Sequence, residues 1–159
     1  MMQARANKLL SIALLFFLFS CGRSDYYTKV YRFENNTWKA KDLKTFDVEI
    51  KDTSKVYDIV FFLRVGTDYN YNNAWIYLHS TLPDKSEHKE AHQFFISNDI
   101  GEWIGNKSGS LVEAEMVFGK RKFDQLGHYK FVIEQATTQK ELKYVSDLGL
   151  KIVESKQRN

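Results

Sequence analysis

The stretch LGHYKFVIEQ, residues 126–135, decides the fold that this sequence predicts. From His128 onward apolar and polar residues alternate, with Tyr129, Phe131 and Ile133 on one side, as in a strand with one buried face. The Leu-Gly-x-Tyr step before the strand resembles a tyrosine corner, in which a tyrosine hydroxyl bonds to upstream backbone in a Greek-key sandwich. The stretch therefore favours an antiparallel β-sandwich, of either immunoglobulin-like or jelly-roll type.

Similar short runs, rich in aromatic and β-branched residues, recur along the chain between polar turns. Residues 46–50 (FDVEI) alternate in the same way, and residues 57–65 (YDIVFFLRV) are apolar on both faces at their centre, as expected of a middle strand. About eight strands at this spacing are typical of a single all-β sandwich. The one helical candidate covers residues 138–148. The other predicted strands are residues 30–33, 74–78, 93–96, 111–118 and 149–154.

Residues 1–20 predict a signal peptide. The first eight residues carry two basic and no acidic side chains, and residues 9–19 (LLSIALLFFLF) are apolar except for one serine. A membrane-spanning helix needs roughly 20 apolar residues, about twice this run. Residues 18–21 (LFSC) resemble the lipobox that lipoprotein signal peptidase reads, although Phe19 is bulkier than the usual occupant. We therefore expect cleavage just before Cys21.

Cys21 is the single cysteine of the chain, so it has no disulfide partner within it. Lipidation explains it: a diacylglyceryl thioether, often with a further acyl chain such as palmitate, anchors a protein stably because two or more chains are buried. Cleavage after Ser20 or Gly22 to release a secreted protein, or an uncleaved anchor, are the less favoured alternatives. The expected organisation is a lipidated N-terminus and tether over residues 21–29, then a sandwich over residues 30–159.

The charge balance of the mature chain excludes one class of partner. Removal of residues 1–20 leaves 139 residues with 21 basic and 20 acidic side chains, a net charge of about +1. Nucleic-acid binding would require a basic patch or stripe, which so small a net charge does not indicate. The remaining length suits one domain with a hydrophobic core.

No pattern in the sequence predicts a catalytic, cofactor or metal site. His88 and His92 lie four residues apart, but Lys89 follows the first histidine where a metalloprotease helix needs glutamate. Glu113 and Glu115 alternate with apolar residues along a predicted strand and are expected on its solvent-facing side. A Gly-x-Ser-x-Gly nucleophile elbow does not occur in the sequence. We therefore expect a protein that is not an enzyme.

Two loops combine aromatic residues with asparagine and glycine: residues 68–75 (DYNYNNAW) and residues 99–106 (DIGEWIGN). Tyrosine and tryptophan offer apolar area with a polar tip, which suits contacts to a sugar or a protein. The alternative is plain turn chemistry, with Trp75 folded into the core. The candidate contact residues are Tyr69, Tyr71, Trp75 and Trp103.

Taken in order, these segments resemble the gliding motility lipoprotein GldH family of the Bacteroidetes. The resemblance covers nearly the whole mature chain, although each piece alone is weak. Residues 136–138 (ATT) depart from the family pattern, in which a Met-Arg pair is common. The segments that carry the resemblance are Cys21, Phe46-x-Val48-x-Ile50-x-Asp52, Tyr57 with Leu63-Arg64, Tyr69-x-Tyr71-x-Asn73-x-Trp75, Pro83, Asp99-x-Gly101-x-Trp103-x-Gly105, Gly127-x-Tyr129-x-Phe131, and residues 142–150.

The resemblance implies a cell-envelope lipoprotein needed for gliding, in bacteria whose adhesins leave by type IX secretion. It implies a structural or assembly component whose partners are other gliding and secretion proteins, and Cys21 is the one functional residue it supplies. Gly22 after the cysteine favours the outer membrane, because an aspartate there would hint at inner-membrane retention. The alternative function is a glycan-binding surface lipoprotein that uses the aromatic loops.

Overall fold

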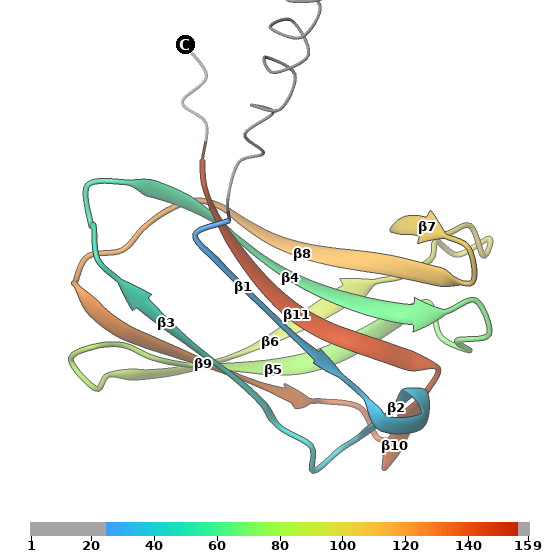
Figure 1. Ribbon diagram of the computed structural model, residues 1–159. Helices are drawn as coiled ribbons and strands as arrows, with labels where there is room; N and C mark the ends of the chain where they lie inside the picture. The colour runs from blue at the N-terminus through green and yellow to red at the C-terminus, as the bar shows by residue number, and fades with distance from the viewer. Residues whose placement is uncertain (1–24, 156–159) are drawn as a thin grey trace, which may run out of the picture.

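The computed structural model describes residues 25–155, so the predicted signal peptide and Cys21 lie outside the described residues. Eleven β-strands make up most of the described region. They form two antiparallel sheets packed face to face, with a small two-stranded ribbon beside them (Figure 1). The all-β antiparallel sandwich that the sequence predicts is confirmed.

The two sheets contain five and four strands. The first holds, in spatial order, β1 (Tyr27–Arg32), β11 (Val145–Glu154), β4 (Val56–Gly66), β8 (Leu111–Lys122) and β7 (Asn106–Ser108). The second holds β3 (Lys44–Ile50), β9 (Gly127–Gln135), β5 (Asn73–Thr81) and β6 (Glu87–Phe95). The ribbon pairs β2 (Thr37–Lys39) with β10 (Glu141–Lys143), and a 3-10 turn, η1 (Glu34–Asn36), precedes it.

The strand order selects one of the two sandwich types that the sequence leaves open. The antiparallel neighbours are β1 with β11, β3 with β9, β4 with β8, and β5 with β6. Paired in this way, the strands are those of one long hairpin, with β5 and β6 at its tip, rolled up into two sheets. That arrangement is the jelly roll.

The core fills the space between the sheets with the inward-facing residues of both. Phe61, near the middle of β4, contacts the rings of Phe46 and Phe131 from the opposite sheet, with ring centroids 6.2 and 6.0 Å apart. Edge-to-face contacts of this kind add to the area that aromatic residues bury. The outward side of β4 is covered too, because Gly149 leaves room for the Phe62 ring over β11. Burial on both sides explains why this strand is apolar at its centre.

The tyrosine corner expected at the entry to β9 is present. The Tyr129 hydroxyl donates a hydrogen bond to the backbone oxygen of Gln125 at 3.1 Å and accepts one from the Gln125 backbone N–H at 3.2 Å. Gly127, between them, has φ of +120°, a value that favours glycine. The corner thus fixes the turn that carries the chain from the first sheet into the second.

The helix predicted over residues 138–148 is wrong. The segment forms β10, a left-handed residue at Tyr144 (φ 63°) and the start of β11. Leu142 is buried opposite Trp38 in the ribbon, and Leu148 is buried in the first sheet. The three-residue spacing of the apolar positions therefore reflects two strands joined by a kink, and pairing with distant strands outweighs the local pattern.

Strands β1 and β6 begin earlier than the sequence predicts. β1 starts at Tyr27 and pairs with β11 from that residue on, so residues 27–29, which the prediction gives to the tether, belong to the first sheet. β6 starts at Glu87 and not at Gln93. Its first half is charged and exposed, as is common in an edge strand, and so lacks the apolar signal of a buried one.

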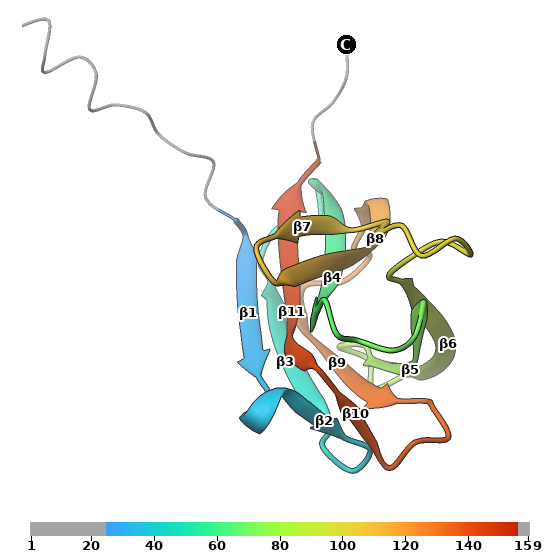
Figure 2. The ribbon, with the colours of Figure 1, turned by 90° about the vertical axis from the view of Figure 1, so that its right-hand side faces the viewer.

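The first described residues and the aromatic loops lie at opposite ends of β4. Tyr26 packs against Tyr57 near the start of β4, with ring centroids 5.1 Å apart, whereas Tyr69 and Tyr71 follow the end of β4. At about 3.3 Å per residue the strand separates these points by about 33 Å. We call the first the tether end and the second the aromatic end; Figure 2 faces the aromatic end.

Candidate functional site

Backbone hydrogen bonds join the two aromatic loops at the aromatic end. The carbonyl of Asn72, in the first loop, accepts bonds from the N–H groups of Ile96 and Ser97 at 2.9 and 3.1 Å. The second loop then closes on itself, because the Ile104 N–H donates to the Ile96 carbonyl at 2.9 Å. The connections β4–β5 and β6–β7 therefore form one surface, although about 30 residues separate them in the sequence (Figure 2).

Three of the four candidate residues line one pocket of about 280 Å³ at this end: Tyr69, Tyr71 and Trp75. The rings of Tyr69 and Tyr71 meet edge to face with centroids 5.6 Å apart. Tyr69 is buried, and this burial raises the pKa of its phenol well above the ordinary value. It therefore stays neutral and donates a hydrogen bond to the Asn73 carbonyl at 3.1 Å. Tyr69 forms the wall of the pocket, and Tyr71 and Trp75 its accessible rim.

Trp75 does not fold into the core. Alternation along β5 points Ala74 and Ile76 inward and leaves Trp75 44% exposed on the outer face of the second sheet. The alternative interpretation of this tryptophan as a core anchor is therefore wrong, and buried Tyr69 has that role in its place. The outcome follows from the strand period of two, which sends every second residue to solvent.

Trp103 lines a second pocket, of about 490 Å³, that shares Tyr69 and Tyr71 with the first. It is half-buried, and its backbone pairs with Ser97 across the second loop. Gly105 allows this placement, because a Cβ there would come within 2.1 Å of the Glu113 carbonyl oxygen on β8. All four candidate residues are thus brought together around the two tyrosines.

The aromatic end also holds exposed apolar residues that the sequence did not single out. Phe95 pairs with Asn73 at the end of β6, and it lines a further pocket of about 400 Å³ together with Ile104. Large apolar patches on a surface mark sites of interaction. Sequence reasoning missed these residues because a lone phenylalanine or isoleucine in a loop looks like core. The exposed large apolar residues of this end are Tyr71, Trp75, Phe95, Ile100 and Ile104.

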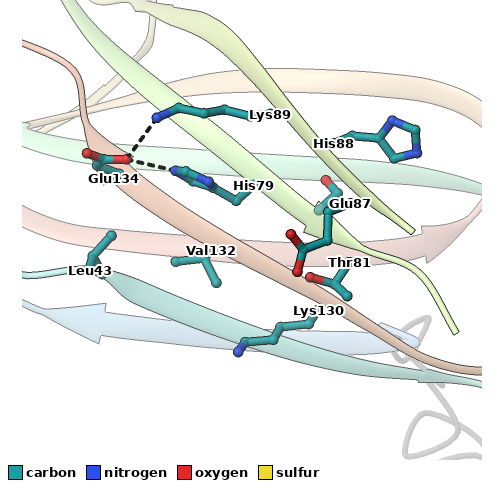
Figure 3. Close-up of a pocket in the computed structure, with 10 residues that line it drawn as sticks. Leu43, His79, Thr81, Glu87, His88, Lys89, Lys130, Val132 and Glu134 are labelled. Carbon is teal, nitrogen blue, oxygen red and sulfur yellow. Dashed lines mark hydrogen bonds and ion pairs between the residues drawn. The ribbon is translucent and has the colours of Figure 1, made fainter. Parts of the chain in front are cut away.

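A polar groove of about 590 Å³ crosses the outer face of the second sheet (Figure 3). Glu134 on β9 lies 2.7 Å from His79 Nε2 on β5 and 3.5 Å from Lys89 Nζ on β6. These two partners, His79 first, hold the pKa of the Glu134 carboxyl below its usual range. Lys89 also lies 4.0 Å above the ring of Tyr77. The groove joins three strands, so only the strand register could reveal it.

The histidine pair does not form a joint site. His88 and His92 both lie on β6, where four residues span about 13 Å, too far for two side chains to share one ion. Within residues 25–155, no group of three or more histidine, cysteine, aspartate or glutamate side chains is placed to hold a metal ion.

In the described part of the chain, no helix is both long and apolar enough to cross a membrane.

Fold and surface together define an all-β jelly-roll domain with exposed aromatic and aliphatic side chains gathered at one end. Residues 25–152 match the GldH lipoprotein family, so the chain belongs to that family and the resemblance inferred from the sequence is confirmed. A gliding motility lipoprotein GldH homolog of Christiangramia forsetii is 28% identical over 126 residues, which cover 74% of this chain and 78% of the relative. The gliding motility lipoprotein GldH of Flavobacterium johnsoniae is 24% identical over 142 residues, 85% of this chain and 88% of the relative.

Proposed function

We propose that this chain is a non-enzymatic structural component of the gliding machinery, linked to type IX secretion and held in the outer membrane by lipid on Cys21. The observation that carries the proposal is the placement of the aromatic end about 33 Å, the length of β4, from the tether end. An anchor on the tether side leaves the aromatic end free to face proteins beyond the lipid surface.

The chemistry of the aromatic end supports a protein partner. Exposed aromatic and aliphatic side chains, here Trp75, Phe95 and Ile100, are rimmed by asparagines that line the neighbouring pockets. Apolar anchors inside a polar rim are the usual composition of a protein–protein interface. The family membership supports the choice of partner, since both relatives are named gliding motility lipoproteins.

The polar clusters support a non-enzymatic role. Close ion pairs on the strands, such as Arg64 with Glu113 at 2.6 Å and His128 with Asp47 at 2.6 Å, join neighbouring strands on solvent-facing sides. An active site would instead gather such groups around an enclosed pocket with strongly perturbed pKa values. Here the groups with charged partners reinforce the sheets.

Gene deletion followed by complementation tests the proposal. We expect the deletion strain to lose colony spreading and adhesin secretion, and the wild-type gene to restore both. A Trp75→Ala, Phe95→Ala double variant should be made and lipidated normally but restore neither. It should also recover fewer envelope proteins when the lipidated chain is purified from the membrane.

The matched control is a Val117→Ala, Leu126→Ala double variant, which removes exposed apolar side chains from the middle of β8 and from the turn between β8 and β9, away from the aromatic end. It should behave as the wild type. Normal spreading and secretion in the deletion strain would overturn the proposal. Equal partner recovery by the two double variants would overturn the assignment of the contact to the aromatic end.

Glycan binding is the second candidate function, because Tyr69, Tyr71 and Trp75 share a pocket. Clustered aromatic rings with adjacent amide groups suit a sugar as well as a protein. A glycan array probed with the wild type and with Trp75→Ala and Trp103→Ala variants separates the two. A sugar that binds the wild type alone would support this candidate, and an empty array would exclude it.

A further inference from the structure

A cavity of about 560 Å³ opens between the two sheets, in a part of the molecule that the proposed function does not use. Its walls come from both sheets: β4 and β8 on one side, β5, β6 and β9 on the other. The lining is largely apolar and includes Phe61, Phe118 and Phe131. Cavities of this size and lining hold small apolar or amphiphilic ligands.

The core is incompletely packed along this cavity. Ile59, Leu78, Phe123, Tyr129 and Phe131 are core residues, yet each keeps 5–8% of its surface exposed. All five line the cavity, whereas most of the remaining core residues have only 0–1% of their surface exposed. Protein interiors are normally as dense as organic crystals, so apolar surface left open inside the sandwich indicates room for an apolar occupant.

The mouth of the cavity carries both signs of charge. Arg121 and Lys122, at the end of β8, are exposed cations, and Glu90 and Asp124 are exposed carboxylates. His92 packs edge to face on Phe118, with centroids 5.1 Å apart, and lies 3.3 Å from Glu90. A head group with one anionic and one cationic part would find a partner for each. A purely anionic head group would lie beside two like charges.

The cavity lies on the tether side of the sandwich. A run of touching rings leads to it: Tyr26 to Tyr57 at 5.1 Å, Tyr57 to Phe123 at 5.6 Å, and Phe123 to Tyr129 at 4.7 Å between centroids. The last two rings of that run line the cavity. Lipid on Cys21, which belongs to the proposed function, would therefore hold this side of the molecule near the bilayer.

We infer that the cavity binds one acyl chain of a zwitterionic membrane phospholipid, with the head group at the Arg121 and Glu90 mouth. The hydrocarbon covers the exposed edges of the core rings, and the head group stays in water between the two pairs of charges. The inference concerns a free lipid that binds the fold, distinct from the lipid attached to Cys21.

Photo-crosslinking tests this inference. The mature lipidated chain is reconstituted in phosphatidylethanolamine vesicles that contain a trace of phosphatidylethanolamine with a diazirine at the end of one acyl chain. After illumination we expect labelled peptides from residues 73–81, 111–122 and 127–135, which supply the cavity wall. Label confined to residues 21–26 would overturn the inference, because it would place the chains in the bilayer alone.

Ser80→Phe provides the matched variant. Ser80 lines the cavity, and its partner in the register is Phe131, so a phenylalanine there fills the space. We expect labelling of the cavity wall to fall at least fivefold. Thr81→Phe, one residue on and facing the outer groove, adds the same ring outside the cavity and should label as the wild type. Equal labelling of the two variants would overturn the inference.

Competition tests the head group. The trace probe should label the cavity wall of the wild type several-fold more in phosphatidylglycerol vesicles than in phosphatidylethanolamine vesicles, because only the second lipid competes with the probe for the mouth. Equal labelling in the two kinds of vesicle would overturn the zwitterionic assignment. The labelling pattern of the wild type decides the inference even if Ser80→Phe does not fold, and it is independent of the spreading and secretion phenotypes that test the proposed function.

Discussion

Gly105 lies where a single Cβ would collide with backbone. An alanine there would place its Cβ 2.1 Å from the Glu113 carbonyl oxygen and force β8 and the second aromatic loop apart. We expect Gly105→Ala to lower the free energy of unfolding by about 1–3 kcal/mol, the usual cost of overpacking. Urea denaturation measures the loss. The control is Gly119→Ala on β8, where the nearest atom to an added Cβ is 3.6 Å away and the stability should change little. Equal losses of stability in the two variants would contradict the steric explanation.

Single residues differ in how far the sequence reveals them. The role of Tyr129 was predictable, because its hydroxyl bonds to backbone only four residues upstream. The Leu-Gly-x-Tyr step, which is local in the sequence, indicates that bond. The requirement for glycine at position 105 was not predictable. An added Cβ would collide with a backbone atom of β8, a strand that begins six residues later and folds back beside Gly105. The exposure of Trp75 was only partly predictable. The alternation of side chains along a strand separates two faces but does not say which of them is buried.

Three strands of the second sheet are joined on their outer face by the carboxylate of Glu134. His79 and Lys89 lower its pKa in the folded state, so the ionised form stabilises the fold. That contribution is present above the pKa of the unfolded chain and is lost as the pH falls through the lower, folded value. We expect stability to drop between pH 6 and pH 3 by more in the wild type than in Glu134→Gln, as measured by urea denaturation at each pH.

The glutamine variant keeps an oxygen that His79 can bond to but removes the titration, so it isolates the charge. Parallel pH profiles for the two proteins would show that Glu134 does not couple the strands. The exposed imidazole of His128, whose pKa is raised by the side chain of Asp47, is present in both proteins and cancels in the comparison. The sequence could not predict the Glu134 cluster, because its members lie 10 and 45 residues apart and meet only in the β6-β5-β9 register.

At the scale of elements, strands with one clean buried face were predictable and the remainder were not. β9 and β3 alternate strictly because one side faces the core and the other faces solvent. The first half of β6 is an exposed edge, and β10 is three residues long, so neither carries enough apolar signal to be seen. The choice of jelly roll depends on which distant strands pair, information that local periodicity does not contain.

For the whole molecule, the strand pairs and the hydrophobic core of the described sandwich are made by residues 25–155. β1 pairs with β11 along six residues from Tyr27 onward, and the core lies between the sheets. Anchoring and folding should therefore be separable properties of this chain. We expect Cys21→Ala to lose incorporation of a clickable palmitate and to be extracted from membranes by alkaline carbonate, because the proposed function places at least two acyl chains on Cys21 and the apolar run of the predicted signal peptide is too short to span.

The same variant should unfold at the temperature of the wild type, since no described core contact is removed. Cell fractionation and thermal unfolding by circular dichroism on the two proteins measure the two properties independently. Carbonate-resistant membrane association of Cys21→Ala without a lipid label would show that something other than the lipid retains the chain. A lowered unfolding temperature would show that the lipid contributes to the fold, as it would if its own acyl chain occupied the cavity between the sheets.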